Sequence, residues 1–350
     1  MSTQPVLSTF GAMRSLSTAQ DMSRLVEAAG FDTLWLPEAG QPVFEICTAA
    51  ALATSSLGIG TGIAVAFARS PMLTAQAAWL LADATGGRFI AGLGTQVKAH
   101  VERRFSAAYS EPGPRLREYV EAMRAIYTAF RGQEKLKFEG KFYNFSLLTP
   151  QWSPGDMEHP DPPIYVAGVR EWMCRMAGES ADGLLVHPLS SVPYLDDVLI
   201  PAVREGEAKA GKAPGATKLI CPIMTAVSDD EAIRAKQREN IRARLGFYGS
   251  TPGYDVVFDA SGFPGVGAEL NQHMRAGDLT ALSATVTDDI VDAMAITCSW
   301  DELPSRLVER FGERADDIQL YSSLEHWGDE ADPVGRWQDV NRRFAELTAS

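Results

Sequence analysis

The order of apolar and polar residues along the chain predicts a repeated strand–helix unit. Short apolar runs rich in β-branched residues indicate buried strands, and longer stretches with apolar residues at helical spacing indicate the helices that cover them. This alternation continues through residue 105 and resumes after residue 163. It requires a parallel sheet whose strands are joined by helical crossovers.

Eight segments have the pattern of a buried strand. They are Val6–Phe10, Thr33–Leu36, Leu57–Ala64, Phe89–Leu93, Ile164–Ala167, Asp182–Val186, Leu219–Val227 and Asp317–Leu320. Eight strands favour a closed (β/α)8 TIM barrel, an α/β fold, over an open doubly wound sheet. We therefore expect one barrel domain over residues 1–350, with extra helices near the carboxyl end.

The predicted helices lie between these strands. Ser17 is the expected cap of the first, which extends to Ala29, and the others are Phe44–Thr54, Pro71–Ala84, Thr95–Arg104, Pro112–Phe130, Glu171–Glu179, Ser191–Ala210, Asp288–Met294, Trp300–Phe311 and Val334–Leu347. Thr251–Asp278, which contains several glycines, is expected to form a loop and a short helix.

The alternation stops once, after the fourth strand. Leu136–Leu148 has a strand–turn–strand pattern around Gly140, and Thr149–Pro163 is rich in proline and polar residues. We interpret residues 135–163 as an insertion that lies over the sheet as a lid.

Composition narrows the classes of partner. The 32 basic and 45 acidic residues give a formal charge of −13, which argues against binding nucleic acid or an anionic membrane surface. The start of the chain lacks the pattern of a signal peptide, and no apolar run has the length of a membrane span, so a cytoplasmic protein is expected. The cysteines are Cys47, Cys174, Cys221 and Cys298; they are far apart, which predicts reduced, buried thiols and no metal site.

The expected chemistry lies at the carboxyl ends of the strands, because the loops of a TIM barrel converge there. These ends are rich in glycine and offer few titratable groups, chiefly Glu38 and His187, with Arg69 and Arg170 as cations. HExxH, GxSxG and P-loop motifs are absent from the sequence. A glycine-rich site with few catalytic side chains indicates that a cofactor carries the reaction.

Four stretches, TGIAVAFARSP, LADATGGRFIAGLGTQ, PPIYVAGV and MAGESADGLLVHP, resemble the bacterial-luciferase-like superfamily, and more narrowly its branch that depends on coenzyme F420. The resemblance implies a barrel that holds a 5-deazaflavin or flavin at its carboxyl-terminal mouth. It makes F420 the expected cofactor, with FMN as the alternative.

The same resemblance implies which residues bind the cofactor. Thr61 would contact the cofactor, whose ring would rest on a bulge with a cis non-prolyl peptide at Gly62-Ile63. Gly94, Thr95 and Gln96 would contact the edge of the ring. The phosphate would bind at Ala167, Gly168, Val169 and Arg170, where a helix begins. The structural alternatives are that Gly62 relieves packing, that Thr95 caps a helix, and that residues 167–170 form an ordinary tight turn.

The titratable residues have two interpretations each. Glu38 would bond a ring nitrogen or relay a proton, or it is a solvated loop carboxylate. His187 would line the pocket or protonate a substrate, or it is a hydrogen-bonded structural histidine. Arg69 would neutralise a cofactor or substrate charge, or it forms a surface ion pair.

One departure from the resemblance restricts the reaction. F420-dependent sugar-phosphate dehydrogenases have a histidine and a glutamate where this chain has Ala39 and Val97, so sugar-phosphate oxidation is not expected. The leading hypothesis is hydride transfer between the deazaflavin C5 and a small carbonyl, imine or conjugated alkene. The alternatives are a monooxygenase that uses reduced FMN and O2, and a flavin-binding protein without catalysis. The expected partners are a second copy, bound through the helix Pro71–Ala84, and a separate reductase that regenerates the cofactor.

Overall fold

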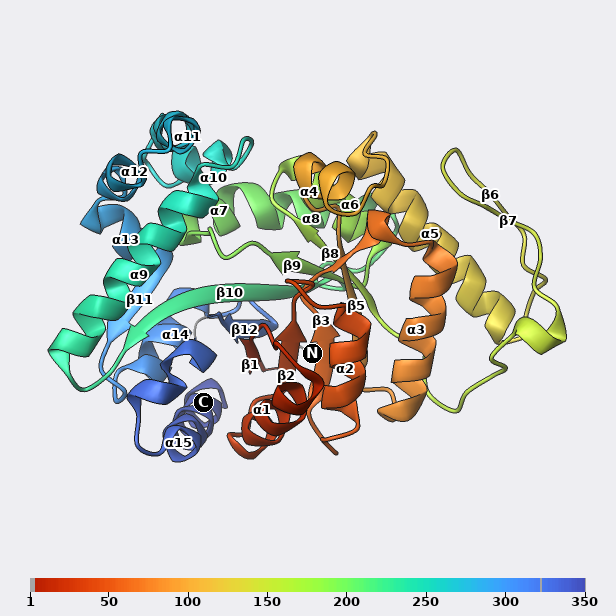
Figure 1. The fold of residues 1–350 in the computed structure, drawn as a ribbon, viewed down its shortest axis with the longest axis horizontal. Helices are drawn as coiled ribbons and strands as arrows, with labels where there is room; N and C mark the ends of the chain where they lie inside the picture. Colours follow the sequence, from red (N-terminus) through yellow and green to blue (C-terminus); the bar gives the residue numbers. More distant parts are fainter. Residues whose placement is uncertain (1–3, 322, 350) are drawn as a thin grey trace.

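Eight parallel strands form a closed barrel in the computed structural model, which describes residues 4–321 and 323–349 (Figure 1). In order around the barrel these strands are β1 (Val6–Phe10), β2 (Thr33–Leu36), β3 (Gly58–Thr61), β5 (Phe89–Gly94), β8 (Ile164–Gly168), β9 (Gly183–Val186), β10 (Lys218–Val227) and β12 (Asp317–Leu320). The pairing of Val6–Thr9 with Asp317–Leu320 closes the ring. The predicted TIM barrel is confirmed.

Helices surround the barrel. They are α1 (Leu16–Ala28), α2 (Val43–Ala51), α3 (Pro71–Ala84), α4 (Lys98–Arg103), α5 (Pro112–Phe130), α6 (Glu171–Ser180), α7 (Val192–Tyr194), α8 (Ile200–Lys209), α9 (Glu231–Gly249), α10 (Asp255–Ala260), α11 (Val266–Ala276), α12 (Leu279–Thr285), α13 (Asp288–Met294), α14 (Leu303–Phe311) and α15 (Pro333–Thr348), with short turns η1 (Ala66–Ala68), η2 (Pro150–Trp152), η3 (Leu195–Leu199) and η4 (Ser323–Asp329). None of those within the described residues combines the length and apolar character needed to cross a membrane. The predicted cap of the first helix is wrong, because Ser15 rather than Ser17 accepts the hydrogen bond from the N–H of Thr18.

The inside of the barrel is filled by large side chains. Trp35, Tyr165, Leu185 and Ile220 come from four different strands and form one buried cluster. Trp35 Nε1 donates to Asp317 Oδ2 at 3.2 Å. Glycines make room for the two aromatic rings, since a Cβ at position 60 would lie 2.4 Å from the Trp35 ring and a Cβ at position 183 would lie 2.8 Å from the Tyr165 ring. The four cysteines are free and buried, as predicted.

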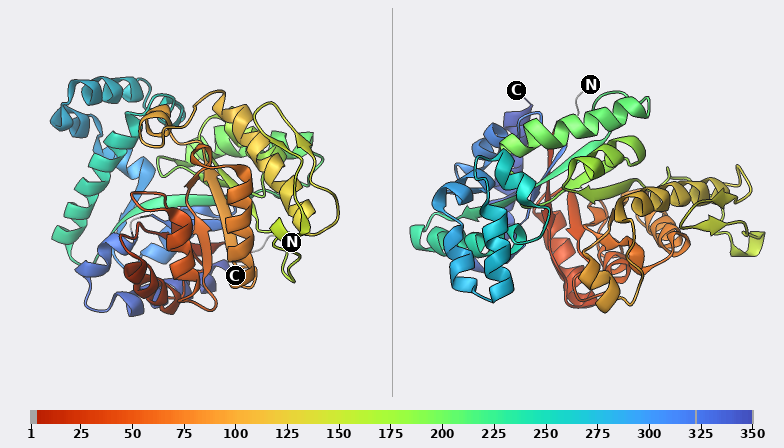
Figure 2. Two further views of the ribbon diagram at one scale, coloured as in Figure 1. Left: turned by 45° about the vertical axis from the view of Figure 1, so that its right-hand side comes forward. Right: turned by 90° about the horizontal axis from the view of Figure 1, so that it is seen from above.

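Strand β10 is ten residues long and extends beyond the barrel. Its first half pairs with β9 and β12, and Met224–Val227 pair with an additional parallel strand, β11 (Ala295–Cys298). Strand β11 was not predicted, because four residues placed directly after a helix carry too little periodic signal. Helices α9 to α13 pack near this extension and form a lobe at one end of the molecule (Figure 2). Part of this lobe, α10 and α11, occupies the segment expected to form a loop and a short helix.

The insertion after the fourth barrel strand forms the predicted hairpin, with β6 (Phe138–Glu139) antiparallel to β7 (Asn144–Phe145). The hairpin extends outward beyond α5, at the end of the molecule opposite to the α9–α13 lobe (Figures 1 and 2). Glu118 on α5 holds it there, because its Oε1 accepts from the N–H groups of Phe142 and Tyr143, each at 2.7 Å. The prediction that residues 135–163 lie over the sheet as a lid is therefore wrong.

Candidate functional site

A bulge interrupts the edge of β3 at the mouth of the barrel. Pairing with β5 stops after Gly60 and resumes at β4 (Ala64–Val65), and the intervening Gly62-Ile63 peptide is cis, as the resemblance implied. The hydroxyl of Thr61 takes the place of the missing backbone bonds: it donates to the carbonyl of Gly92 at 2.7 Å and accepts from its N–H at 2.8 Å. Thr61 is fully buried, so its side chain stabilises the bulge from below and does not reach the mouth.

Three of the predicted glycine positions lie side by side. Gly62 directly follows β3, and Gly94 and Gly168 end β5 and β8; the three strands are neighbours in the barrel. Ile63 packs directly on Gly94, where a Cβ would lie 2.8 Å from Ile63 Cδ1. Gly62 and Ile63 are partly exposed, whereas the residues on either side of them are buried. The bulge therefore exposes part of Gly62 and of the apolar Ile63 side chain at the end of the strand.

Glu38 and Arg69 form an ion pair beside the bulge. Glu38 Oε1 accepts from Arg69 Nη2 at 2.5 Å and Oε2 accepts from Arg69 Nη1 at 2.7 Å. Oε2 also accepts from the N–H of Val65 at 2.7 Å, and the N–H of Glu38 donates to the carbonyl of Ile63 at 3.2 Å. Burial alone would lower the pKa of Arg69, but its hydrogen bonds to Glu38 and the Glu38 charge raise it.

The ion pair contradicts two of the structural alternatives considered for these residues. The Glu38 side chain is only 4% exposed, so it is not a solvated loop carboxylate, and Arg69 pairs below the surface. The two charges neutralise each other, and both side chains also form hydrogen bonds with backbone groups around the bulge. The arrangement suits residues that hold Gly62 and Ile63 in place.

The end of β5 continues into a short non-helical segment. Gln96 has a φ of 56°, its Oε1 accepts from the N–H of Val97 at 2.9 Å, and its carbonyl accepts from the Thr95 hydroxyl at 3.1 Å. Helix α4 starts only at Lys98, with Val97 before it and no side-chain cap. The alternative that Thr95 caps a helix is therefore wrong. Thr95 and Gln96 are both partly exposed at the end of the strand.

The turn from β8 into α6 brings a helix amino terminus to the mouth. Gly168 allows the end of β8 to approach α6 closely, because a Cβ at position 168 would lie 2.9 Å from Met173 Cβ. Val169 is fixed by the Tyr194 hydroxyl, which donates to its carbonyl, and Arg170 is exposed at the start of the helix. The first amide groups of a helix have no acceptor within it and favour a bound anion. Ala167 is partly exposed just before this turn.

His187 lies at the end of β9 between two tyrosine rings. Its ring centroid is 4.6 Å from that of Tyr254 and 4.9 Å from that of Tyr248. Burial lowers the pKa of His187 to about 3. Nδ1 accepts from the N–H of Leu189 at 3.0 Å, so the proton of the neutral ring is on Nε2. His187 is thus a neutral donor, not an acid, at neutral pH.

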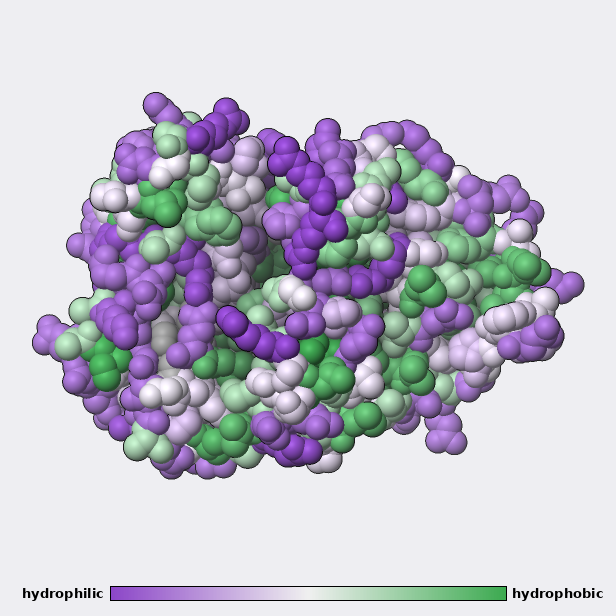
Figure 3. All heavy atoms as spheres, in the orientation of Figure 1, coloured by the Kyte–Doolittle hydropathy of each residue, from purple (hydrophilic) through white to green (hydrophobic). Residues whose placement is uncertain are grey.

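An aromatic wall, defined as Phe10, His187, Tyr248, Tyr254 and Tyr321, completes the mouth. Phe10 stacks on Tyr321 with ring centroids 4.5 Å apart, and the Tyr321 and Tyr248 hydroxyls are 2.6 Å apart. All five residues are partly exposed. Figure 3 shows the surface hollowed between the α9–α13 lobe and the part of the molecule that carries α4.

The three tyrosines of this wall were not predicted from the sequence. Tyr248 and Tyr254 lie at the end of α9 and just before α10, and Tyr321 follows the last barrel strand. These positions share no motif. The only signal for the first two was the dense aromatic run FYGSTPGY at residues 247–254.

Comparison with known proteins supports this architecture. The chain is 39% identical over 295 residues to the uncharacterized protein Rv1360 of Mycobacterium tuberculosis, covering 84% of this chain and 87% of the relative. It is 28% identical over 295 residues to the 5,10-methylenetetrahydromethanopterin reductase of Archaeoglobus fulgidus, covering 82% and 83% of the two chains.

Two solved structures have the same fold. The coenzyme F420 dependent tetrahydromethanopterin reductase of Methanopyrus kandleri superposes with a TM-score of 0.78 at 18% identity, covering 99% of this chain and all of the other. The oxygenating constituent of 3,6-diketocamphane monooxygenase from Pseudomonas putida, in complex with FMN, superposes with a TM-score of 0.67 at 15% identity, covering 98% and 99%.

The family assignment comes from a match over most of the chain. The model of the luciferase-like monooxygenase family matches residues 2–317. These residues include the first seven barrel strands, the first residue of β12 and every predicted site residue. This chain belongs to the luciferase-like monooxygenase family.

Proposed function

We propose that the chain is an oxidoreductase that uses coenzyme F420 and transfers hydride between the deazaflavin C5 and a small organic substrate. The proposal is based on the composition of the mouth. Backbone at Gly62-Ile63, Gly94 and Gly168 forms one side of it, and the mouth contains few acid–base groups. The similarity to 5,10-methylenetetrahydromethanopterin reductases and to an F420-dependent reductase structure supports the choice of cofactor.

The residues at the mouth fit such a cofactor. A flat ring would rest on Gly62-Ile63 and Gly94, with Thr95 and Gln96 along its edge, and a phosphate would bind the amino terminus of α6 at residues 167–170. When bound, the deazaflavin supplies or accepts the hydride. Glu38 and Arg69 act as positioning residues, because their ion pair and the bonds to Ile63 and Val65 hold the bulge on which the ring would lie.

His187 is the proposed substrate-binding donor. A neutral imidazole with its proton on Nε2 donates a hydrogen bond to a carbonyl or imine and polarises it without giving up the proton. Together with Tyr248 and Tyr254, it would orient the acceptor over the ring, which supplies much of the rate of a hydride transfer.

A monooxygenase that uses reduced FMN and O2 is the second candidate, because a structure of the same fold binds FMN. Purified protein mixed in turn with F420 and with FMN separates the two, with absorbance and fluorescence as readouts. We expect binding of F420 and much weaker binding of FMN. Tight binding of FMN without binding of F420 would reject the first proposal, and binding without turnover on carbonyls, imines and enones would indicate a non-catalytic protein.

We also propose that two copies associate through α2 and α3, with a separate reductase regenerating the cofactor. Leu52, Leu73 and Leu80 on or next to these helices are 71%, 60% and 66% exposed, and Figure 3 shows apolar side chains over this part of the surface. Light scattering after size exclusion should give a dimer for the wild type and a monomer for Leu73→Glu/Leu80→Glu. A double variant that stays dimeric would place the interface elsewhere.

A further inference from the structure

A cavity of about 460 Å³ opens beside β11, outside the set of residues that form the mouth. Ala295 and Ile296 of β11 line one side, and Arg306, Glu309 and Arg310 of α14 line another. Within the described residues β11 pairs only with β10, so its other edge retains backbone groups free to bond a ligand. The volume is in the range of sites for small molecules.

Arg310 brings a charge to this cavity that no carboxylate balances in the described part of the chain. Its Nη2 donates to the carbonyl of Ala293 at 2.6 Å, and its guanidinium carbon lies 6.0 Å from the centroid of the Phe311 ring. Burial lowers the pKa of Arg310 to about 10, so it stays charged at neutral pH. A guanidinium has five donors, and a desolvated cation without a counter-ion is costly.

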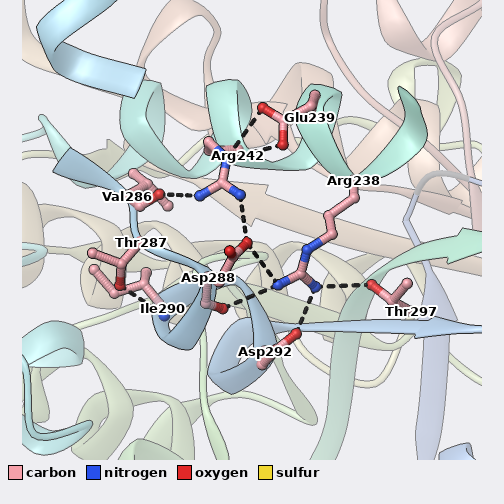
Figure 4. Close-up of polar contacts among 9 residues, drawn as sticks. All are labelled: Arg238, Glu239, Arg242, Val286, Thr287, Asp288, Ile290, Asp292 and Thr297. Carbon is pink, nitrogen blue, oxygen red and sulfur yellow. Dashed lines mark hydrogen bonds and ion pairs between the residues drawn. The ribbon is translucent and has the colours of Figure 1, made fainter. Parts of the chain in front are cut away.

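The two carboxylates near Arg310 already have partners. Asp292 Oδ1 accepts from Arg238 Nη1 at 2.5 Å, and the same nitrogen donates to the Thr297 hydroxyl at 3.1 Å (Figure 4). Arg238 and Arg242 both bond Asp288, which fixes this network beside the cavity. Glu309 is 3.4 Å from Arg306, and both side chains are exposed.

We propose that this cavity binds a small organic anion, with a carboxylate or phosphate group on Arg310 and Arg306 and an apolar remainder against Ala295 and Ile296. Two guanidiniums one helical turn apart on α14 form a suitable pair of donors for either anionic group. The neighbouring Glu309 competes for Arg306, so a ligand must displace this exposed contact. The site is independent of the proposed redox function, because it shares no residue with the mouth.

Thermal unfolding at constant ionic strength tests the proposal, with inorganic phosphate and butyrate as separate probes and chloride as the balancing anion. We expect at least one probe to raise the Tm of the wild type, and its half-effective concentration to rise about tenfold or more in Arg310→Met. Phosphate alone would indicate a phosphorylated ligand, and butyrate a carboxylic acid. Equal responses in the wild type and Arg310→Met, or no response to either probe, would overturn the proposal.

Two further variants keep the test decisive if Arg310→Met does not fold. Arg306 and Glu309 are exposed, so Arg306→Met and Glu309→Gln should fold; the first is expected to weaken binding several-fold and the second to strengthen it. Arg24→Met, at an exposed arginine of α1 that lines neither the cavity nor the mouth, is the matched control and should leave the response unchanged. Loss of the response in Arg170→Met alone would assign the anion to the amino terminus of α6 and reject the cavity.

Discussion

One side of the barrel mouth is formed by backbone and the other by side chains. On the side of β3, β5 and β8, the surface is backbone: a bulge at Gly62-Ile63 and glycines at positions 94 and 168. The rest of the mouth is the aromatic wall, whose side chains come from β1, β9, the α9–α10 segment and the end of β12. The two parts meet at Phe10, which would lie 3.8 Å from a Cβ at position 62. The backbone side is shaped by strand geometry and hydrogen bonds, so a side chain added there would displace the neighbour that packs on the backbone.

Because of this difference, we assign a separate function to each side of the mouth. A surface made of backbone suits a cofactor whose shape does not vary, since close approach is possible only where side chains are missing. A wall of side chains on separate elements is easily altered by single substitutions, and this suits the choice of substrate. The predictions below test whether the two sides are in fact separable.

The largest effect is expected at Gly94. A Cβ at this position would lie 2.8 Å from Ile63 Cδ1, so Gly94→Val should push Ile63 into the mouth and weaken cofactor binding by about a hundredfold or more. Fluorescence titration with F420 measures the loss, and far-UV circular dichroism should stay unchanged. Gly94→Ala should lie between the wild type and the valine variant. Unchanged affinity in Gly94→Val would show that the ring does not rest on Ile63.

The next effect concerns the ion pair that holds the bulge. Glu38→Gln leaves the guanidinium of Arg69 partly buried without its carboxylate, which should cost about 3 kcal/mol in the free energy of unfolding. Arg69→Gln should cost a similar amount, and the double variant clearly less than the sum of the two. Urea denaturation of all four proteins gives the coupling. Additive losses would mean that the two residues act independently.

On the aromatic wall, Tyr254→Ala should raise the KM for the substrate about tenfold, or ~1.4 kcal/mol. The substrate for this measurement is the carbonyl or enone that the wild type reduces. The affinity for the cofactor should change less than about twofold, because Tyr254 contacts the ring of His187 and is not part of the bulge. Steady-state kinetics and cofactor titration measure the two quantities separately. A parallel loss of both would show that the sides are not separable.

The smallest effect is a pair of opposite pH dependences. The pKa of His187 is lowered to about 3 by burial, so this residue stabilises the fold above its unfolded pKa and loses that contribution as pH falls. Burial raises the pKa of Asp317, inside the barrel, to about 7, so its contribution is lost as pH rises. Between pH 6.5 and 5.5 each changes the free energy of unfolding by about 1 kcal/mol, in opposite directions.

The wild type should therefore show little change in stability over this interval. His187→Asn should become more stable as pH falls from 6.5 to 5.5, because only the Asp317 contribution remains. Asp317→Asn should become less stable over the same interval. Urea denaturation at the two pH values checks all three proteins, and equal slopes in the two variants would contradict the assignment.

The barrel itself could be predicted from the sequence, because its strands are apolar runs that alternate with amphipathic helices. Pro71–Ala84, Pro112–Phe130 and Asp288–Met294 have the predicted bounds, since proline or acidic residues mark their starts. Strand β11 was missed, and the position of the hairpin was wrong, because its attachment depends on the carboxylate of Glu118 on a neighbouring helix. Such contacts between distant segments leave no local pattern.

The site was only partly predictable for the same reason. Glycine at a strand end marks a close approach of the backbone, so Gly62, Gly94 and Gly168 could be identified one by one. The partners of Glu38 and His187 could not, because Arg69 and Leu189 acquire their roles only once the loops are folded. The tyrosines of the aromatic wall are brought together by three separate elements, and no spacing between them is fixed.

Strand β10 has a mechanical consequence. One continuous strand pairs first with β9 and β12 and then with β11. The lobe and the barrel therefore share one hydrogen-bonded sheet and are not connected by a hinge. Swinging the whole lobe outward would break the ladder between Met224–Val227 and Ala295–Cys298. An opening of the mouth that keeps this ladder intact would be confined to loops such as the turns around α10, where Gly253, Gly262 and Gly265 have left-handed backbones.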